Sequence, residues 1–140
     1  MIYLLDTNVI SELRERRSRP ANPNVRQWAN GIATSSLYLS AVTIMELELG
    51  ILQLHLREPE QAAVLRAWLD GRVLIAFAGR IVSIDTEIAQ RAAALHVPTR
   101  ISELDAFLAA TALVHSMTVV TRNTAHFAPT GVRTLNPWHA

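Results

Sequence analysis

The sequence contains neither cysteine nor lysine, and each absence removes a class of function. Without cysteine the chain has no disulfide framework, no thiolate zinc site and no cysteine nucleophile. This composition fits a reducing compartment, so we expect a cytoplasmic protein. Without lysine, all 13 basic residues are arginines, set against 12 acidic residues. No apolar run approaches the roughly 18 residues that span a bilayer, so we expect no membrane association.

Length and composition predict a single folded domain over residues 1–140. Half of the residues are apolar and 18% are charged, which argues against disorder. A chain of this length can bury one substantial core. The net charge of +1 indicates nothing for or against nucleic acid. A local cluster of arginines begins at the end of the first predicted helix and consists of Arg14, Arg16, Arg17 and Arg19. It could contact phosphates or could be a solvated helix end, and both interpretations stay open.

Short apolar segments alternate with helical patterns along the chain. Strands are predicted at residues 2–5, 37–39, 81–84, 118–120 and 132–135. Helices are predicted at residues 7–14, 25–32, 42–56, 59–69, 87–95 and 103–115. This alternation predicts an α/β fold with a parallel central sheet between two helical layers.

The predicted helix at 42–56 has two apolar faces. At about 100° per residue, one face carries Val42, Met45, Leu49, Leu52 and Leu56, and the other carries Ile44, Leu47, Ile51 and Leu54. Packing on a sheet requires only one apolar face. The second face must be covered either by more of this chain or by a partner subunit, and in a domain of this size we expect a partner.

Acidic residues follow several of the predicted strands. Asp6 ends the first strand, Glu46 lies one turn into the helix after the second, and Asp105 lies in the first turn of the helix before the fourth. In open parallel sheets, functional groups gather beyond the carboxyl ends of the strands, where the strand order reverses. Asn123 follows the fourth strand and can reach the same place.

Each of these residues has a structural explanation when taken alone. Asp6 could cap a helix, and Asp105 could simply complement a helix dipole. Glu46 and Glu48 point about 200° apart on the helix, so only one of them can face a given site. Asp85 also follows a strand, and we expect it to cap the next helix. The five histidines show no metal-ligand spacing and are expected to be structural or solvent-facing.

Taken together, the acidic residues favour a metal site. Clustered carboxylates raise one another's pKa values, and a hard divalent cation relieves their repulsion. Mg²⁺ binds one or two carboxylates, keeps several waters and contacts a substrate phosphate. Such a site can hydrolyse a phosphodiester without a protein nucleophile.

Four segments, in order along the chain, resemble PIN-domain ribonucleases of the VapC toxin type. They are LLDTN at 4–8, SAVTIME at 40–46, LDAFLAATA at 104–112 and VVTRN at 119–123. The segments FAGRI at 77–81 and NPWH at 136–139 are similar to the FitB-like branch. The resemblance implies a PIN-like three-layer α/β/α sandwich, dependence on Mg²⁺ or Mn²⁺, and endonucleolytic cleavage of RNA. It also implies a homodimer, a cognate antitoxin protein that inhibits the toxin, and a larger complex with operator DNA.

The resemblance to PIN-domain ribonucleases also implies which residues form the site. Asp6, Glu46 and Asp105 match the family's catalytic and metal-binding acids, while Thr7, Asn8 and Thr121 match the polar residues that orient them. The family's fourth acidic position holds Asn123 here, so one negative charge is missing. This supports a first metal site and puts a tight second site in doubt.

Two other functions compete with this prediction. A catalytically weak PIN scaffold that acts through antitoxin and operator binding is favoured only by Asn123. An aspartyl-phosphate protein would use Asp6 as the nucleophile and needs a second acid beside it. The neighbours of Asp6 are Leu5 and Thr7, and a chain without lysine cannot supply the lysine of a receiver domain.

Overall fold

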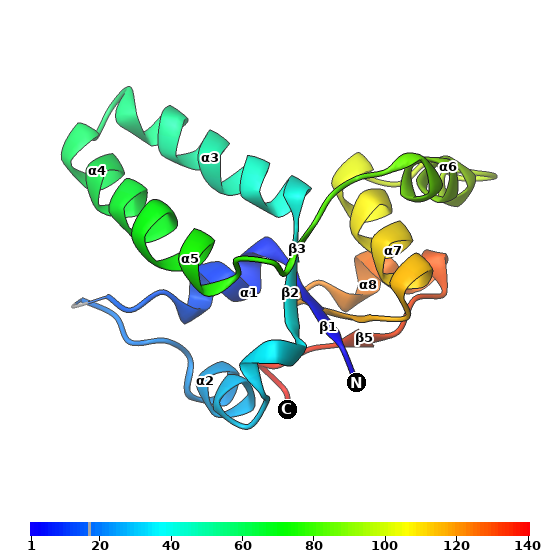
Figure 1. The fold of residues 1–140 in the computed structure, drawn as a ribbon, viewed down its shortest axis with the longest axis horizontal. Helices are drawn as coiled ribbons and strands as arrows, with labels where there is room; N and C mark the ends of the chain where they lie inside the picture. The colour runs from blue at the N-terminus through cyan, green and yellow to red at the C-terminus, as the bar shows by residue number, and fades with distance from the viewer. Residues whose placement is uncertain (17) are drawn as a thin grey trace.

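A computed structural model describes residues 1–16 and 18–140. Within these residues five parallel strands form one sheet in the order β3-β2-β1-β4-β5 (Figure 1). The strands are β1 (Tyr3–Leu5), β2 (Leu37–Ser40), β3 (Ile81–Val82), β4 (Thr118–Val120) and β5 (Thr134–Leu135). The strand order reverses between β1 and β4, which places a switch point at the ends of these two strands. The predicted α/β fold with a parallel sheet is confirmed.

Helices cover both faces of the sheet. On one face are α1 (Thr7–Leu13), α2 (Pro23–Asn30), α3 (Ala41–His55), α4 (Pro59–Trp68) and the short α5 (Leu74–Ala76). On the other are α6 (Thr86–Leu95), α7 (Glu103–His115) and α8 (Thr124–Phe127). Single turns complete the chain at η1 (Thr34–Ser36), η2 (Leu69–Val73) and η3 (Ala128–Thr130).

Alternate strand residues divide between two hydrophobic cores, as the period of two in a strand requires. Leu5, Leu39 and Val120 belong to the core under α1 to α4. Leu4 and Val119 belong to the core under α7 and α8, with Leu108 and Phe127. The β-sheet is therefore the middle layer of three.

The α3–α4 hairpin and the α6–α7 pair form two arms that extend to opposite sides of the sheet (Figure 1). The helical path that begins at Pro59 continues through the π-helical turn η2 as far as Ala76. It runs past the predicted end at 69 because nothing between Leu69 and Ala76 stops it, and Gly71 is accommodated within the π turn. No helix of the described residues is long and apolar enough to cross a membrane.

Caps and strand ends explain where the elements differ from prediction. Helix α2 begins at Pro23, before the predicted 25, because Asn22 Oδ1 accepts a hydrogen bond from Asn24 N at 2.9 Å. Strand β3 stops at Val82, before the predicted 84. Its partner β2 ends where α3 begins, so residues 83–84 have no strand to pair with. The predicted cap at Asp85 is confirmed, since its Oδ1 accepts from Ile88 N at 2.9 Å.

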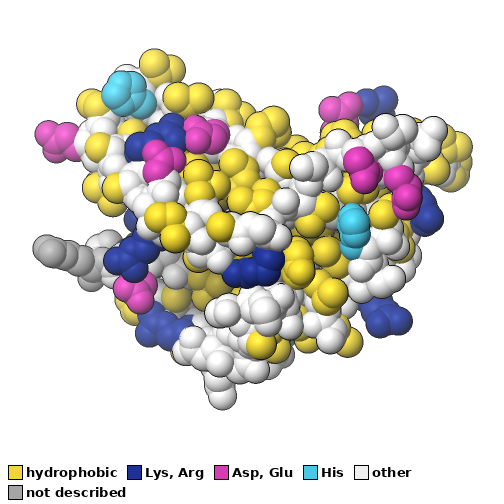
Figure 2. Space-filling model, in the orientation of Figure 1, with side chains coloured by type: hydrophobic (Ala, Val, Ile, Leu, Met, Phe, Trp, Pro, Cys, Tyr) yellow, Lys and Arg dark blue, Asp and Glu magenta, His cyan; other side chains and the backbone are white. Residues whose placement is uncertain are grey.

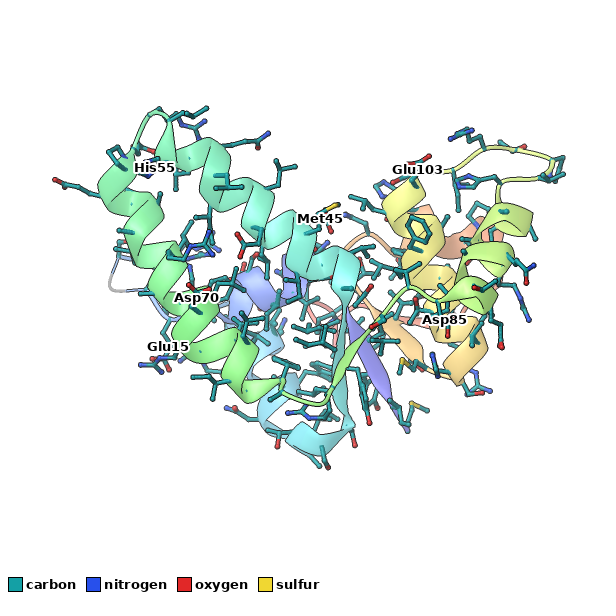
Figure 3. The ribbon with its side chains drawn as sticks, turned by 45° about the horizontal axis from the view of Figure 1, so that its top comes forward. Glu15, Met45, His55, Asp70, Asp85 and Glu103 are labelled. Carbon is teal, nitrogen blue, oxygen red and sulfur yellow. The ribbon has the colours of Figure 1, made fainter. Side chains whose placement is uncertain are left out.

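Helix α3 buries one of its two apolar faces. Leu47 and Ile51 are buried in the core beneath α3 and α4. The opposite face is open, with Met45, Leu49, Leu52 and Leu56 between 49% and 86% exposed. Figure 3 shows Met45 on the side of α3 turned away from α4, and Figure 2 shows hydrophobic side chains along this edge. The buried face is thus the one that contains Ile44.

Candidate active site

A pocket of about 470 Å³ lies beyond the carboxyl ends of β1 and β4, at the switch point of the sheet. Its lining brings together six of the seven residues named from the sequence: Asp6, Thr7, Asn8, Glu46, Asp105 and Asn123. The seventh, Thr121, is fully buried and hydrogen-bonded to Asp6. Thr121 and Asp6, which are 115 residues apart in the chain, are thus in direct contact.

Asp6 is held rigidly at the end of β1. Its backbone N–H donates to the Val120 carbonyl at 2.9 Å, which continues the β1–β4 pairing. Its carboxylate accepts from Thr7 N at 2.7 Å and from Thr121 Oγ1 at 2.8 Å. Asp6 is the N-cap of α1, as the structural explanation proposed, and it also lines the pocket. The two roles are compatible because each carboxylate oxygen has more than one acceptor site.

Thr121 and Asn8 join the ends of the two central strands. The Thr121 hydroxyl donates to Asp6 and accepts from Asn123 N at 3.0 Å, so it fixes the turn that presents Asn123. Asn8 Oδ1 accepts from Arg122 N at 3.3 Å. These bonds place the segment after β4 directly beside the segment after β1.

Glu46 points into the pocket and Glu48 points away from it. Thr7 Oγ1 donates to Glu46 Oε1 at 2.6 Å, which orients that carboxylate. Glu48 instead makes a two-pronged ion pair with Arg66 of α4, with N–O distances of 2.7 and 2.8 Å. The opposite directions expected from helical geometry are confirmed.

Asp105 enters the pocket from the first turn of α7, where Ser102 is the N-cap. The Oδ2 atom of Asp105 lies 3.8 Å from His126 Nδ1. His126, on α8, also lines the pocket and was not among the residues predicted from the sequence. Its position three residues after Asn123, in the helix that follows β4, was the available signal.

The three acids have raised pKa values. Desolvation by burial is the main cause for Asp6, opposed by the hydrogen bonds from Thr121 and Thr7. Burial also raises the pKa of Glu46, and the charges of Asp6 and Asp105 raise it further. Burial followed by the Asp6 charge raises the pKa of Asp105, while His126 lowers it. The pocket therefore concentrates acidic groups whose mutual charge His126 offsets only in part.

The donor set suits a hard divalent cation bound partly through water. All three acids offer oxygen ligands, and each keeps acceptor capacity after its hydrogen bonds are counted. Among the described residues, no group of three His, Cys, Asp or Glu side chains is close enough to enclose an ion directly. Mg²⁺ needs only one or two direct carboxylates and retains waters, so this spacing fits it.

Comparison with known proteins identifies the family. Residues 3–131 match the PIN domain model. The chain is 40% identical to toxin FitB of Neisseria gonorrhoeae, covering 99% of both proteins. It is 34% identical to VapC ribonuclease Y4jK of Sinorhizobium fredii, covering 98% of both. In structure it resembles FitAB bound to an IR36 DNA fragment, with a TM-score of 0.87, 37% identity and coverage of 99% of this chain and 97% of that one.

The chain belongs to the PIN-domain family, and its relatives place it with the FitB and VapC toxins. Membership implies use of a divalent metal, which agrees with the acidic pocket. The predicted PIN-like fold is confirmed.

Proposed function

We propose that this protein is the toxin of a type II toxin–antitoxin system and that it hydrolyses RNA phosphodiester bonds at the acidic pocket. One observation carries the proposal: three partly buried carboxylates with raised pKa values converge on one pocket at the switch point of the sheet. Among the described residues that line this pocket, none is an arginine. Unneutralised negative charge destabilises a fold, so its presence indicates a cation-dependent function.

Asp6, Glu46 and Asp105 are proposed to hold Mg²⁺ or Mn²⁺, one or two of them directly and the remainder through bound water. When bound, the ion would activate a water and stabilise the leaving oxygen of an in-line displacement. Thr7 and Thr121 hold two of the carboxylates at fixed positions through their hydroxyl groups. Asn8 and Asn123 present amide groups at the rim, where Asn123 can hold a water or a phosphate oxygen.

The comparisons support protein and DNA partners. FitAB, whose structure this chain resembles, is bound to DNA, and the resemblance to VapC toxins implies a cognate antitoxin protein. We propose the same partners here, with operator DNA contacted as part of the larger complex. The open face of α3 supports a homodimer, because four large apolar side chains there have no cover.

The test is RNA cleavage by the purified chain, freed of partner and treated with EDTA. We expect no cleavage until Mg²⁺ or Mn²⁺ is restored. Cleavage that persists in EDTA would contradict the proposed metal dependence. Absence of cleavage with Mn²⁺ in excess would favour the catalytically weak scaffold, which Asn123 suggests.

A further inference from the structure

The arginine cluster after α1 divides in the structure. Arg19 is exposed and pairs with Glu12 at 2.8 Å. Arg14 and Arg16 lie elsewhere, in a groove bounded by α1, α3 and α4. Arg17, the fourth member of the cluster, lies outside the described residues. The solvated interpretation therefore fits Arg19, and the phosphate interpretation stays open for Arg14 and Arg16.

The groove is continuous with the acidic pocket. Thr7 and Glu46 line both the pocket and the near part of the groove. Arg14, Arg16 and Trp68 line this near part and also an outer part, which extends to Glu15 and Arg72. A strand that leaves the pocket past Thr7 would thus meet the arginines next.

Apolar side chains form much of this groove, and most of its charged residues are positive. Four arginines line it: Arg14, Arg16, Arg57 and Arg72. Its acidic lining residues are Glu46, which also lines the pocket, and Glu15, which lines the outer part. Among the described residues, Arg14, Arg16 and Arg72 make no salt bridge, and Arg57 makes only a long one of 3.9 Å to Glu58.

Arg14 is set in position by an aromatic ring. Its guanidinium carbon lies 5.9 Å from the centre of the Trp68 ring, within the range of a cation–π contact. Burial and the neighbouring charge of Arg16 lower the pKa of Arg14. An anion between the two guanidinium groups would relieve this repulsion, just as a cation would relieve the repulsion among the acids.

We propose that this groove, lined by Arg14, Arg16, Arg57 and Trp68, binds the RNA strand on one side of the bond that is cut. The inference rests on the proposed ribonuclease function and adds the path of the substrate. The arginines contact successive phosphates, and Trp68 offers an aromatic surface to a base. We choose a polyanion as the occupant on charge complementarity, because the charged residues described in the lining are four arginines and two glutamates.

The test uses a fluorescein-labelled, single-stranded 10-nucleotide RNA in EDTA, with binding measured by anisotropy over a range of KCl concentrations. The Arg14→Gln/Arg16→Gln variant is compared with wild type and with a control of equal charge, Arg19→Gln/Arg91→Gln. Arg19 is paired with Glu12, and Arg91 lies on α6 in the other arm. A third variant, Arg14→Lys/Arg16→Lys, keeps the charge and guards against a loss that comes only from misfolding.

We expect the groove variant to bind RNA about 10-fold more weakly or worse, with a salt slope smaller by roughly 0.7 for each phosphate that the variant no longer neutralises. The control should match wild type, and the lysine variant should recover the salt slope. With Mn²⁺, the groove variant should show a raised KM for the 10-nucleotide RNA and an unchanged kcat for a dinucleotide, which reaches only the pocket.

Each outcome bears on a separate claim. If wild type cleaves RNA and the groove variant binds with the same affinity and salt slope, the groove inference is overturned and the proposed function stands. If the groove variant loses only inhibition by the antitoxin, the groove belongs to the protein partner and the inference is overturned. If RNA binding falls as expected but wild type never cleaves, the groove stands and the ribonuclease proposal fails.

Discussion

Glu46 and Glu48 are two residues apart on α3 and meet opposite electrostatic environments. The hydrogen-bonded ion pair with Arg66 lowers the pKa of Glu48. Burial and the neighbouring Asp6 and Asp105 raise the pKa of Glu46. The Glu48 side of the helix is neutralised and joins α3 to α4, whereas the Glu46 side gathers charge of one sign. The difference separates a group placed for structure from one placed for chemistry.

The largest effect on activity is expected at Asp105, one of the acids that raise the pKa of Glu46. Asp105→Asn removes the charge of one proposed ligand and should lower RNA cleavage by at least about 100-fold, since even residues that only support a metal ligand often cost 10- to 100-fold. Without metal, its thermal stability should equal or exceed that of wild type, because one repelling charge is gone. Initial rates in Mg²⁺ and thermal unfolding in EDTA check both statements.

Asp85→Ala is the matched control for Asp105→Asn. Asp85 caps α6 and does not line the pocket. Its loss should cost about 1 kcal/mol of stability and leave the cleavage rate unchanged. Near wild-type cleavage by Asp105→Asn would show that the acid is not a ligand.

Glu46→Gln and Glu48→Gln test the comparison on a single helix. Glu46→Gln should reduce cleavage roughly 10- to 100-fold. Glu48→Gln breaks a partly exposed ion pair, so it should leave cleavage intact and lower the thermal midpoint only slightly. Equal losses of activity in the two variants would mean that the direction of these side chains does not decide their function.

The two apolar faces of α3 give the next test. Leu52→Arg changes the open face and should weaken self-association at least about 10-fold while the chain stays folded. Ile51→Arg, one residue away, buries a charge and should cost about 3 kcal/mol or more. Light scattering and circular dichroism measure the two outcomes. A wild-type chain that is monomeric at all concentrations would refute the dimer.

A smaller effect is expected at Asn123. Asn123→Asp restores a carboxylate at the rim of the pocket. If the added carboxylate strengthens Mn²⁺ binding by about 1 kcal/mol, the Mn²⁺ concentration for half-maximal cleavage falls about 5-fold. An unchanged metal titration would place this side chain out of reach of the ion.

Much of this site could be predicted because it depends on the ends of strands. Asp6 and Asn123 follow strands. Glu46 and Asp105 lie near the starts of the helices α3 and α7 that connect strands, so a parallel sheet brings all four to its carboxyl edge. The hydrophobic pattern also indicated that α3 has two apolar faces. It could not indicate which one is buried, because that depends on how α3 and α4 pack on the sheet.

Other features required the structure. The position of His126 just after β4 suggested that it lies near the pocket, but its approach to within 3.8 Å of Asp105 depends on how α7 and α8 pack. The arginine groove depends on Trp68 and Arg57, which lie far along the chain from Arg14. Arg80 gives a third example, since it binds the carbonyls of Thr34, Leu37 and Ala76 and so joins η1 and β2 to α5. Contacts between distant segments of this kind leave no periodic trace in the sequence.

Burial, reinforced by repulsion at Glu46 and Asp105, disfavours the charged carboxylates of the pocket until a divalent cation binds. The direct measurement is the free energy of unfolding against pH, with EDTA and with Mn²⁺, for wild type and Asp105→Asn. Since the pKa of Asp105 is raised in the folded state, its stabilising contribution is present below the ordinary value of 3.8 and is lost as pH rises through the raised value. In EDTA, wild type should therefore lose stability relative to Asp105→Asn across that window, and Mn²⁺ should reverse the difference at pH 7. Identical curves for the two proteins, with no stabilisation of wild type by Mn²⁺, would contradict the account.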